Sequence, residues 1–375
     1  MNNFLKLTFS LCACFSLVFS TDLVSQEIEE VVVTATKKEE SIQDLAVSVE
    51  AFTADDIDNN MVEDFSDLAE VVPGLIIDKA IGSGASYSMR GVGSYGVGAA
   101  VVASLITSIN GHAVGSSALT DTGFHDLERI EVLKGPQGTL SGRNAVQGLV
   151  NLVTARPTGE FEGKVEVTMG NFNSERVNMV LNAPLSDKVA MRLATSTFKR
   201  DGVIDNIHTG NDIDGRDAYG IRLSVDLDIS ETTKLEFTHD RSETEDNRQN
   251  IGIIVCEPHP VFGCSPLERG TFGQSADTRG STAALFNFIA GLNSTADSNS
   301  YEGINALGSL EKVNINRDPE HHQVFEFTML ELNHDISDEL QLVVKGTYST
   351  RDYYHMGDND YNVAVNPFPG LFPPG

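Results

Sequence analysis

A glycine-rich segment at residues 126–157, DLERIEVLKGPQGTLSGRNAVQGLVNLVTARP, joins two short strand-like runs. The first run, 129–133, alternates apolar and charged residues, and the second, 149–154, is mostly apolar. A Gly-Pro turn at 135–136 and further glycines lie between them. Glycine allows positive φ angles and close backbone approach. Because strands this short bury little surface alone, the segment predicts part of a compact α+β domain.

The glycines of this segment lack the spacing of a phosphate-binding loop, which follows the pattern GxxxxGK[ST]. Counting from Gly135 places Leu140 at the second glycine, and counting from Gly138 places Arg143 there. The dinucleotide-binding pattern GxGxxG does not open a helix here either. The sequence therefore gives no support to nucleotide binding.

The same segment resembles the plug-domain signature of TonB-dependent outer-membrane receptors, for which a run like ERIEVLKGPQGTLSGRNAVQGLVNLVT is diagnostic. An upstream Arg-Gly pair resembles a second plug element of that family. The residues that carry the resemblance are Arg90, Gly91, Arg129, Glu131, Lys134, Gly135, Pro136, Gly138, Gly142, Arg143, Asn144, Gly148 and Asn151. The resemblance implies an α+β plug domain followed by antiparallel transmembrane β-barrel strands, in the outer membrane of a Gram-negative bacterium.

The N-terminus carries two further signals. Residues 1–20 have a weakly basic start and an apolar run, which predicts a signal peptide and a mature chain from Thr21. Within 21–40, a β-branched segment resembles the TonB box of these receptors: Glu30, Val31, Val32, Val33, Thr34, Ala35 and Thr36. Such a segment can add a strand to a partner protein, or it can be an edge strand of the next domain. The resemblance implies TonB as that partner, with ExbB and ExbD acting indirectly.

Residues 41–157 are expected to form the plug domain. Thr53 can cap a helical turn over 53–60, and a second helix is expected over 64–72. The segment 102–111 departs from the pattern of the family, although it keeps an Asn-Gly turn at its end.

Residues 159–375 show long two-residue alternation, which predicts about seven strands. Short turns at 186–187, 230–231 and 337–338 alternate with long polar connections at 201–217 and 246–321. Such asymmetry is typical of a transmembrane β-barrel, whereas a soluble β-sandwich is the alternative. Barrels of this kind have about 22 strands. We therefore expect a complete plug beside an open, incomplete barrel that alone neither inserts stably nor transports.

Net charge and cysteine content limit the partners and the kinds of site that we expect. A net charge of −28 makes nucleic acid a poor partner. No catalytic constellation, cofactor motif or metal site stands out, so we expect no enzyme. Once the signal peptide is removed, Cys256 and Cys264 remain, and in an exported protein this pair predicts a local disulfide. A metal site is the alternative, but only His259 lies between them as a further ligand.

The resemblance implies uptake of a bulky ligand, energised through TonB, by a protein surrounded by outer-membrane lipid. A ferric siderophore is the usual ligand of the family, and cobalamin or an oligosaccharide stays open. Arg90, Arg129 and Arg143 are expected to pin the plug to acidic barrel residues such as Glu166 or Asp226. The alternatives are a passive porin or adhesin barrel and a periplasmic β-sandwich enzyme.

Overall fold

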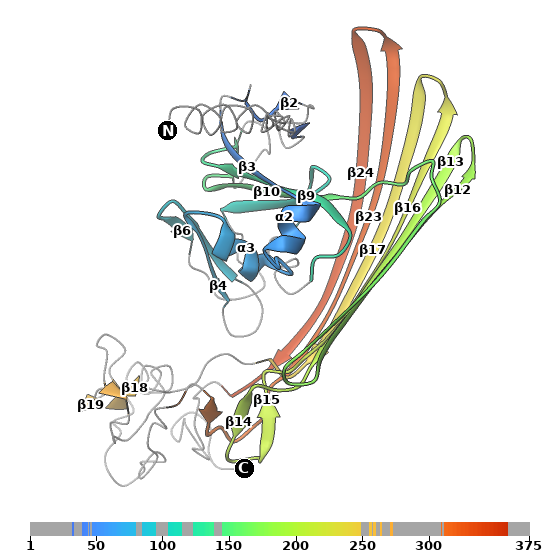
Figure 1. The fold of residues 1–375 in the computed structure, drawn as a ribbon. Helices are drawn as coiled ribbons and strands as arrows, with labels where there is room; N and C mark the ends of the chain where they lie inside the picture. Colours follow the sequence, from blue (N-terminus) through green and yellow to red (C-terminus); the bar gives the residue numbers. More distant parts are fainter. Residues whose placement is uncertain are drawn as a thin grey trace, which may run out of the picture.

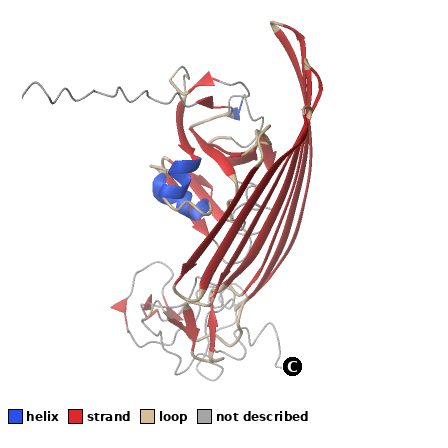
Figure 2. Ribbon diagram, turned by 45° about the vertical axis from the view of Figure 1, so that its right-hand side comes forward, coloured by secondary structure: helices blue, strands red, loops and turns tan. Residues whose placement is uncertain are grey.

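The computed structural model describes residues 47–79, 85–94, 104–114, 123–138, 145–248 and 311–358, together with short pieces at 32–33, 40–43, 45, 255–256, 258–259, 263–264, 271–272 and 309. Its two main parts are an N-terminal α+β domain and a long antiparallel sheet (Figure 1). The domain lies on the concave side of the sheet in both views (Figure 1, Figure 2). Within the described ranges, the helices are too short or too polar to cross a membrane.

The domain is built on a five-stranded sheet in the order β3-β9-β10-β7-β8. Its strands are β3 (Ser48–Thr53), β9 (Leu127–Lys134), β10 (Gly148–Thr154), β7 (Leu105–Ile109) and β8 (His112–Val114). The two predicted strands of the glycine-rich segment are β9 and β10, which pair antiparallel, and β10 also pairs parallel with β7. Every residue of β10 is buried, which explains its nearly continuous apolar sequence.

Two short helices follow β3 where the sequence predicts them, and the first has the predicted Thr53 cap. Helix α2 (Ala54–Asn59) begins after Thr53, whose side chain accepts a hydrogen bond from the backbone of Asp56. Helix α3 (Phe65–Val71) begins after Asp64, which caps its first turn in the same way. Both caps are reciprocal, so backbone N–H groups that the helix leaves unpaired are satisfied locally.

The core of the domain lies between these helices and two sheets. The second sheet consists of β4 (Leu75–Lys79), β5 (Ala85–Met89) and β6 (Val92–Ser94). Phe65 and Leu68 are fully buried. Three side chains of the long sheet belong to the same apolar cluster: Phe325, Phe327 and Met329. The domain and the long sheet therefore share one core.

The long sheet has seven antiparallel strands in the order β11-β12-β13-β16-β17-β23-β24. They are β11 (Glu162–Gly170), β12 (Ser174–Ser186), β13 (Val189–Arg200), β16 (Arg216–Ser230), β17 (Thr233–Asp246), β23 (Glu320–Ser337) and β24 (Leu340–Met356). Tight turns join β12 to β13, β16 to β17 and β23 to β24 where the sequence predicts them. We call the side facing the domain the inner face and the opposite side the outer face.

Smaller sheets lie beyond the ends of the long strands. The connection at 201–217 carries a hairpin of β14 (Ile204–Asn206) and β15 (Asn211–Ile213), which pairs with β22 (Lys312–Val313). This hairpin was not predicted, because a few apolar side chains in a polar segment form its separate core. The remaining pairs are β1 (Val32–Val33) with β2 (Glu40–Ser41), β18 (Val255–Cys256) with β21 (Thr271–Phe272), and β19 (Pro258–His259) with β20 (Gly263–Cys264).

Candidate functional site: the seam between the domain and the sheet

The polar residues of the glycine-rich signature join three strands of the domain. Glu131 and Asn151 are fully buried. The Glu131 carboxylate accepts from Asn151 Nδ2 at 3.0 Å and from Arg129 Nε at 2.8 Å. Asn151 Oδ1 accepts from the Ser108 hydroxyl at 2.8 Å and from the Gly111 N–H at 2.9 Å. These signature residues therefore hold β9, β10 and the β7–β8 turn together.

Gly148 and Lys134 face each other at the loop end of the same hairpin. Gly148 has φ +149°, and a Cβ atom there would lie 2.2 Å from the backbone oxygen of the facing strand, so only glycine fits. Lys134 Nζ bonds the Glu50 carboxylate at 2.5 Å and the Pro73 carbonyl at 2.9 Å. The lysine thus ties β9 to β3 and to the segment that ends α3.

Arg90 and Gly91 form the turn between β5 and β6, with φ angles of +52° and +79°. Arg90 Nη2 donates to the Ser48 hydroxyl at 2.7 Å. Gly135, Pro136 and Gly138 lie in the described part of the loop after β9, whereas Gly142, Arg143 and Asn144 lie outside the described residues.

The predicted TonB box and cysteine pair are described only in part. Val32 and Val33 form β1, and Val33 is fully buried. Glu30, Val31, Thr34, Ala35 and Thr36 lie outside the described residues. The backbones of Cys256 and Cys264 lie in β18 and β20, but their side chains fall outside what the structure describes, so the disulfide stays a prediction.

The strongest attachment of the domain to the sheet lies at His125 and Asp126, just before β9. Arg192 from β13 holds the Asp126 carboxylate with two hydrogen bonds, from Nε at 2.8 Å and Nη2 at 2.6 Å. Arg222 from β16 donates to the His125 carbonyl at 2.9 Å and to Asp240 of β17 at 2.7 Å. The His125 ring lies 3.3 Å from the same Asp240 carboxylate. An arginine that donates two hydrogen bonds to one carboxylate, as Arg192 does to Asp126, fixes the orientation of the two groups as well as their distance.

A glycine in the sheet makes room for this attachment. A Cβ atom added at Gly220 of β16 would lie 3.0 Å from the His125 ring. Contacts this short force a neighbouring group to move. Gly220 therefore lets the ring of His125 pack directly against β16.

A second attachment lies at Arg156, just after β10. The guanidinium of Arg156 pairs with Asp226, and it lies 3.0 Å from Glu236. The start of β9 and the end of β10 are neighbours, because the Ala155 N–H donates to the Asp126 carbonyl at 3.1 Å. Both attachments therefore hold the same end of the signature hairpin.

Further contacts cross the seam at other places. Arg176 of β12 bonds Glu63, which precedes α3, at 2.5 Å, and it stacks over Phe198 at 4.3 Å. Burial raises the pKa of Glu63, and the nearby Arg176 opposes this shift. The ring of His112 in β8 lies 3.5 Å from Glu331 of β23.

The contacts differ in part from the expected direction. The domain arginines Arg90 and Arg129 bond residues of the domain itself, namely Ser48, Glu128 and Glu131. Most of the cations that cross the seam come from the sheet instead and reach acidic groups of the domain. Arg156 is the exception that fits the expectation, since it meets the predicted Asp226.

The signal that could have identified the sheet arginines is the two-residue alternation. Arg176, Arg192 and Arg222 share their face with polar side chains of each strand, and all three are buried. An arginine on the polar face of a strand beside a plug is a candidate for contact with it. The sequence does not say which acidic group it meets.

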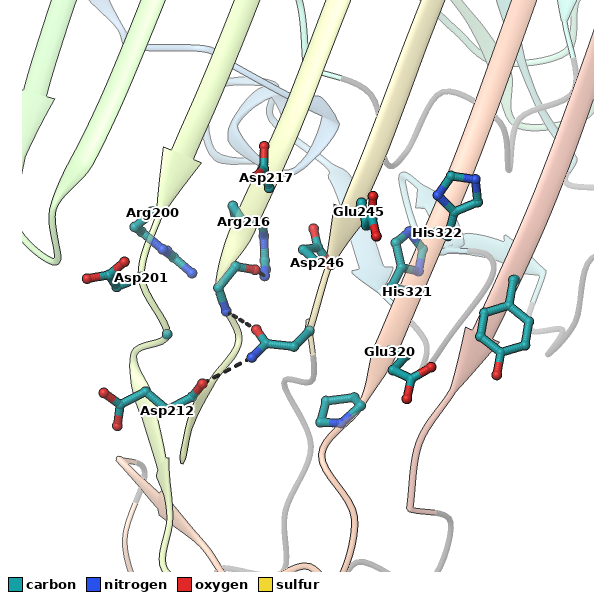
Figure 3. A pocket seen from close by; sticks show the side chains of 15 residues that line it. Arg200, Asp201, Asp212, Arg216, Asp217, Glu245, Asp246, Glu320, His321 and His322 are labelled. Atoms are coloured by element: carbon teal, nitrogen blue, oxygen red, sulfur yellow. Dashed lines mark hydrogen bonds between the residues drawn. The ribbon is translucent and has the colours of Figure 1, made fainter. Parts of the chain in front are cut away.

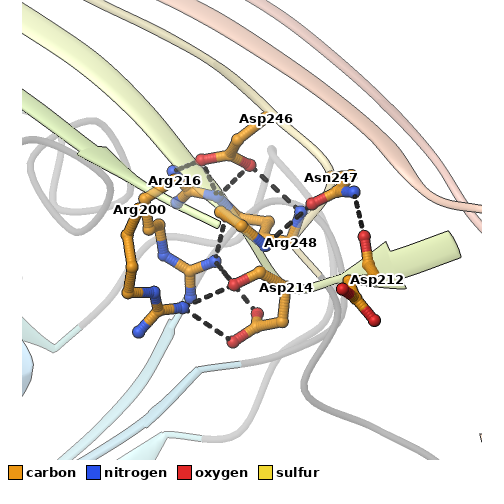
Figure 4. Close-up of polar contacts among 8 residues, drawn as sticks. Arg200, Asp212, Asp214, Arg216, Asp246, Asn247 and Arg248 are labelled. Carbon is orange, nitrogen blue, oxygen red and sulfur yellow. Dashed lines mark hydrogen bonds and ion pairs between the residues drawn. The ribbon is translucent and has the colours of Figure 1, made fainter. Parts of the chain in front are cut away.

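Hollows lie beyond the seam, towards β14 and β15. A hollow of about 900 Å³ is lined by the ends of β13, β16, β17 and β23, with His321, His322 and mostly acidic side chains (Figure 3). Next to it, Arg200 and Arg216 both bond the Asp214 side chain, at 3.3 and 3.0 Å (Figure 4). A smaller hollow of about 330 Å³ lies at the seam itself, beside Arg176.

A group of possible metal ligands lies on the outer face. Side-chain oxygen or nitrogen atoms of Glu243, Glu245 and His322 come within 4.8 Å of one another. Glu243 already accepts hydrogen bonds from Tyr219 at 2.7 Å and Arg241 at 2.8 Å. Its carboxylate is therefore largely satisfied by the protein.

Residues 41–149 match the family model of the TonB-dependent Receptor Plug Domain. The chain is 25% identical over 261 residues to the iron-regulated outer membrane virulence protein of Vibrio cholerae, covering 66% of this chain and 40% of that protein. It is 31% identical over 169 residues to the pesticin receptor of Yersinia enterocolitica, covering 42% and 23%. The chain thus spans less than half the length of these curated relatives.

Solved structures share the fold. The ferric yersiniabactin uptake receptor of Yersinia pestis superposes with a TM-score of 0.60 at 19% identity, covering 82% of this chain and 41% of that one. The ferripyoverdine receptor of Pseudomonas aeruginosa bound to ferripyoverdine gives a TM-score of 0.61 at 16% identity, covering 88% and 38%.

Residues 41–149 thus match the plug domain of TonB-dependent receptors, and the chain is similar in sequence and in fold to outer-membrane receptors, as the sequence predicts. The curated relatives are named as an outer membrane protein, a transporter and a receptor.

Proposed function

We propose that this protein takes up a bulky nutrient of the ferric siderophore class across the outer membrane, with energy delivered through TonB. The observation that carries this proposal is the plug domain held by buried ion pairs against the inner face of a sheet whose outer face carries many exposed apolar side chains. Each half of that observation supports one part of the function.

The outer face supports contact with lipid. Apolar side chains there are well exposed, for example Met179 at 46%, Leu330 at 48% and Val344 at 52%. They lie on β12, β23 and β24, so exposed apolar side chains occur from near one edge of the sheet to the other. Exposed apolar surfaces of this extent mark interaction sites, and a membrane is the partner that fits alternating strands.

The seam supports a need for energy. Arg192 is buried and the Asp126 side chain is 9% exposed, so separating the two leaves charges without partners in a poorly hydrated space. Breaking one buried pair in this way costs about 3–5 kcal/mol. A plug held by several such contacts is suited to a receptor that is opened by work rather than to a passive porin.

The N-terminal segment supports TonB as the source of that work, with ExbB and ExbD behind it. Val32 and Val33 adopt an extended strand in β1, which is the conformation that strand addition requires. Within this proposal residues 1–20 are the signal peptide, 21–40 the TonB box and linker, 41–157 the plug, and 159–375 the barrel strands.

The relatives' names support the ligand class. They include an iron-regulated outer membrane protein, a ferric enterobactin receptor of Pseudomonas aeruginosa and a vitamin B12 transporter of Photobacterium profundum. A hollow of about 900 Å³ has the size of a small-molecule site. Iron chelates are therefore the first ligands to test, and cobalamin is the second.

The direct test uses a deletion strain complemented with a complete receptor that carries this chain, because the chain alone is expected neither to insert stably nor to transport. Uptake of ferric enterobactin, ferripyoverdine and vitamin B12 is measured for the wild type, Val32→Pro and Val32→Ala. Proline removes the backbone N–H that an added strand uses, whereas alanine keeps it. We expect uptake of one iron chelate to be lost in Val32→Pro and retained in Val32→Ala, with ligand binding unchanged. Normal uptake in Val32→Pro would contradict TonB contact at this segment.

The cysteine pair is a separate part of the proposal. We propose a disulfide between Cys256 and Cys264 in the connection at 246–321. For so short a loop the chain-entropy estimate is roughly 2–3 kcal/mol, acting locally. Mass spectrometry without reductant should detect the linked peptides, and two free thiols in protein from the envelope would refute the bridge.

A further inference from the structure

One buried side chain on the inner face has surroundings that the seam does not explain. His321 of β23 is 2% exposed, and neither of its ring nitrogens has a hydrogen-bond partner among the described residues. Buried polar atoms normally have one, so an unsatisfied imidazole calls for an explanation. Its ring packs edge-on against Tyr353 at 5.5 Å and His355 at 5.7 Å between centroids.

His321 lies in a row of possible metal ligands. Asp246 of β17 and His355 of β24 are its direct cross-strand neighbours. Directly opposite residues of a sheet share one face, with Cβ atoms about 4.5–5.5 Å apart. His322, the next residue along β23, projects from the other face, because successive side chains of a strand alternate.

The charges around this row favour the imidazoles over the carboxylate as ligands. Arg248 binds Asp246 through Nε at 2.8 Å and Nη2 at 2.6 Å, so this carboxylate is already neutralised. Arg351 donates to Gln323 at 2.6 Å and stacks over Tyr353. A hard cation such as Ca²⁺ or Mg²⁺ needs several oxygen ligands, which this row does not offer.

We propose that His321 and His355 bind a divalent transition-metal ion of the kind that prefers imidazole nitrogen, namely Cu²⁺, Ni²⁺ or Zn²⁺. This site lies on the inner face of the long sheet and needs no contact with TonB, so it goes beyond the proposed uptake function. Two imidazoles leave further coordination positions, which water or the ligand atoms of an incoming chelate can fill.

The geometry permits a shared ion. A ring nitrogen lies about 1.1 Å from its ring centre, so two rings 5.7 Å apart can bring nitrogens to within about 3.5 Å, a gap that metal–nitrogen bonds of about 2.0–2.1 Å span. Rotation of both rings about their Cβ–Cγ bonds is the movement required. His321 also lines the hollow of about 900 Å³, which gives an ion a route to the site (Figure 3).

The test titrates the metal-free, full-length protein in detergent with CuCl2 and ZnCl2. Calorimetry gives the affinity, and electron paramagnetic resonance of the Cu²⁺ form counts coordinated nitrogens. We expect one ion with two nitrogens in the wild type. His355→Ala should leave one nitrogen and weaken binding by about a hundredfold or more, since even changes behind a ligand cost about 10–100-fold. His321→Gln should act in the same way, and Ca²⁺ should not compete.

His322→Ala is the matched control, because it removes the neighbouring imidazole on the outer face. It should keep both nitrogens and the wild-type affinity. Loss of binding in His322→Ala with binding retained in His321→Gln and His355→Ala would overturn the proposal and place the ion at Glu243, Glu245 and His322. Absence of binding in the wild type, or a Cu²⁺ spectrum without nitrogen coupling, would also overturn it. Thermal melts of each apo variant show whether the fold is kept.

Discussion

The two faces of the long sheet are made by the same strands and differ in almost every physical respect. On β16, Arg222, Ser224 and Asp226 point inward and are buried, whereas Ile221 and Leu223 point outward beside them. The inner side chains have specific polar or charged partners in the plug or on neighbouring strands. The outer ones have no specific partner chemistry and need only an apolar surrounding.

This contrast shows how a strongly acidic chain can contain a basic surface. The overall charge is −28, yet several arginines gather on the inner face where the plug docks. Their partners are carboxylates of the plug and of neighbouring strands. Net charge therefore says little about the seam, because the charges that matter there are few, buried and paired.

The largest expected loss of stability comes from a substitution that disrupts contacts on the inner face. In Arg222→Met, Asp240 loses its charged partner, and the His125 carbonyl loses a donor. We expect a loss of about 3–5 kcal/mol in the free energy of unfolding, as is usual when one half of a buried pair is removed. The neighbouring Ile221→Ala, on the outer face, should cost far less. Denaturant unfolding of both variants in detergent is the measurement, and equal losses would contradict the contrast between the faces.

The next largest effect is expected from a charged substitution on the outer face. Val225 lies between the inward Ser224 and Asp226 and points outward. Val225→Arg should cost about 2–4 kcal/mol in a bilayer, because a charge on the lipid face near the midplane is not solvated. The amount of protein in the outer-membrane fraction reports this loss, with Val225→Ile as the control. Unchanged levels of the arginine variant would indicate that this face is not in lipid.

A smaller effect sharpens the description of the seam. Gly220→Ala introduces a Cβ atom 3.0 Å from the His125 ring, whereas Gly346→Ala on β24 meets nothing within 4 Å. We expect the first substitution to cost about 1–3 kcal/mol, the usual range for overpacking, and the second to cost much less. Thermal unfolding of both variants gives the comparison. Similar melting temperatures would show that His125 does not pack against Gly220.

The smallest effect concerns pH at the edge of the seam. Burial raises the pKa of Glu63 above its ordinary value of 4.5, despite the nearby Arg176. A raised pKa means that the folded protein binds the proton more tightly than the unfolded chain. This contribution is full below the unfolded pKa and is lost as pH rises through the raised value. Between pH 4 and 7 the free energy of unfolding should therefore fall more steeply with rising pH for the wild type than for Glu63→Gln.

Asp318 gives a comparison of opposite sign outside the seam. Burial acts to raise its pKa, but hydrogen bonds from Asn211, Asn206 and Thr209 outweigh burial and lower it. Its contribution to stability is therefore present above the unfolded pKa and is lost as pH falls through the lowered value. Asp318→Asn should remove part of the loss of stability in acid. The same pH dependence of the free energy of unfolding in the wild type and in Asp318→Asn would contradict the lowered pKa of Asp318.

Local patterns in the sequence were sufficient for much of the fold. Thr53 and Asp64 begin helices because a cap is a contact within one turn. The two-residue alternation and the tight turns locate the seven strands. Gly148 and Asn151 were recognised from the signature, and the structure adds why they are needed: a close backbone approach and a three-strand junction.

The partners across the seam could not be predicted in the same way. Arg192 and Asp126 are 66 positions apart, and their meeting depends on how two independently formed parts dock. The expectation that plug arginines would reach the sheet was wrong for Arg90, because this residue bonds Ser48 of the plug. The hairpin β14–β15 was missed since its core depends on distant Val313 and Ile315.

The central claim is that the outer face of the long sheet lies in lipid while the inner face holds the plug. Single cysteines at successive positions 221–227 of β16, in a background without other cysteines, can carry spin labels in outer-membrane vesicles. Accessibility to oxygen, which concentrates in lipid, is then measured for each label. The account predicts a two-residue period, with high oxygen accessibility at Ile221, Leu223, Val225 and Leu227 and low accessibility at the positions between. Equal accessibility along the strand, or the opposite phase, would contradict it.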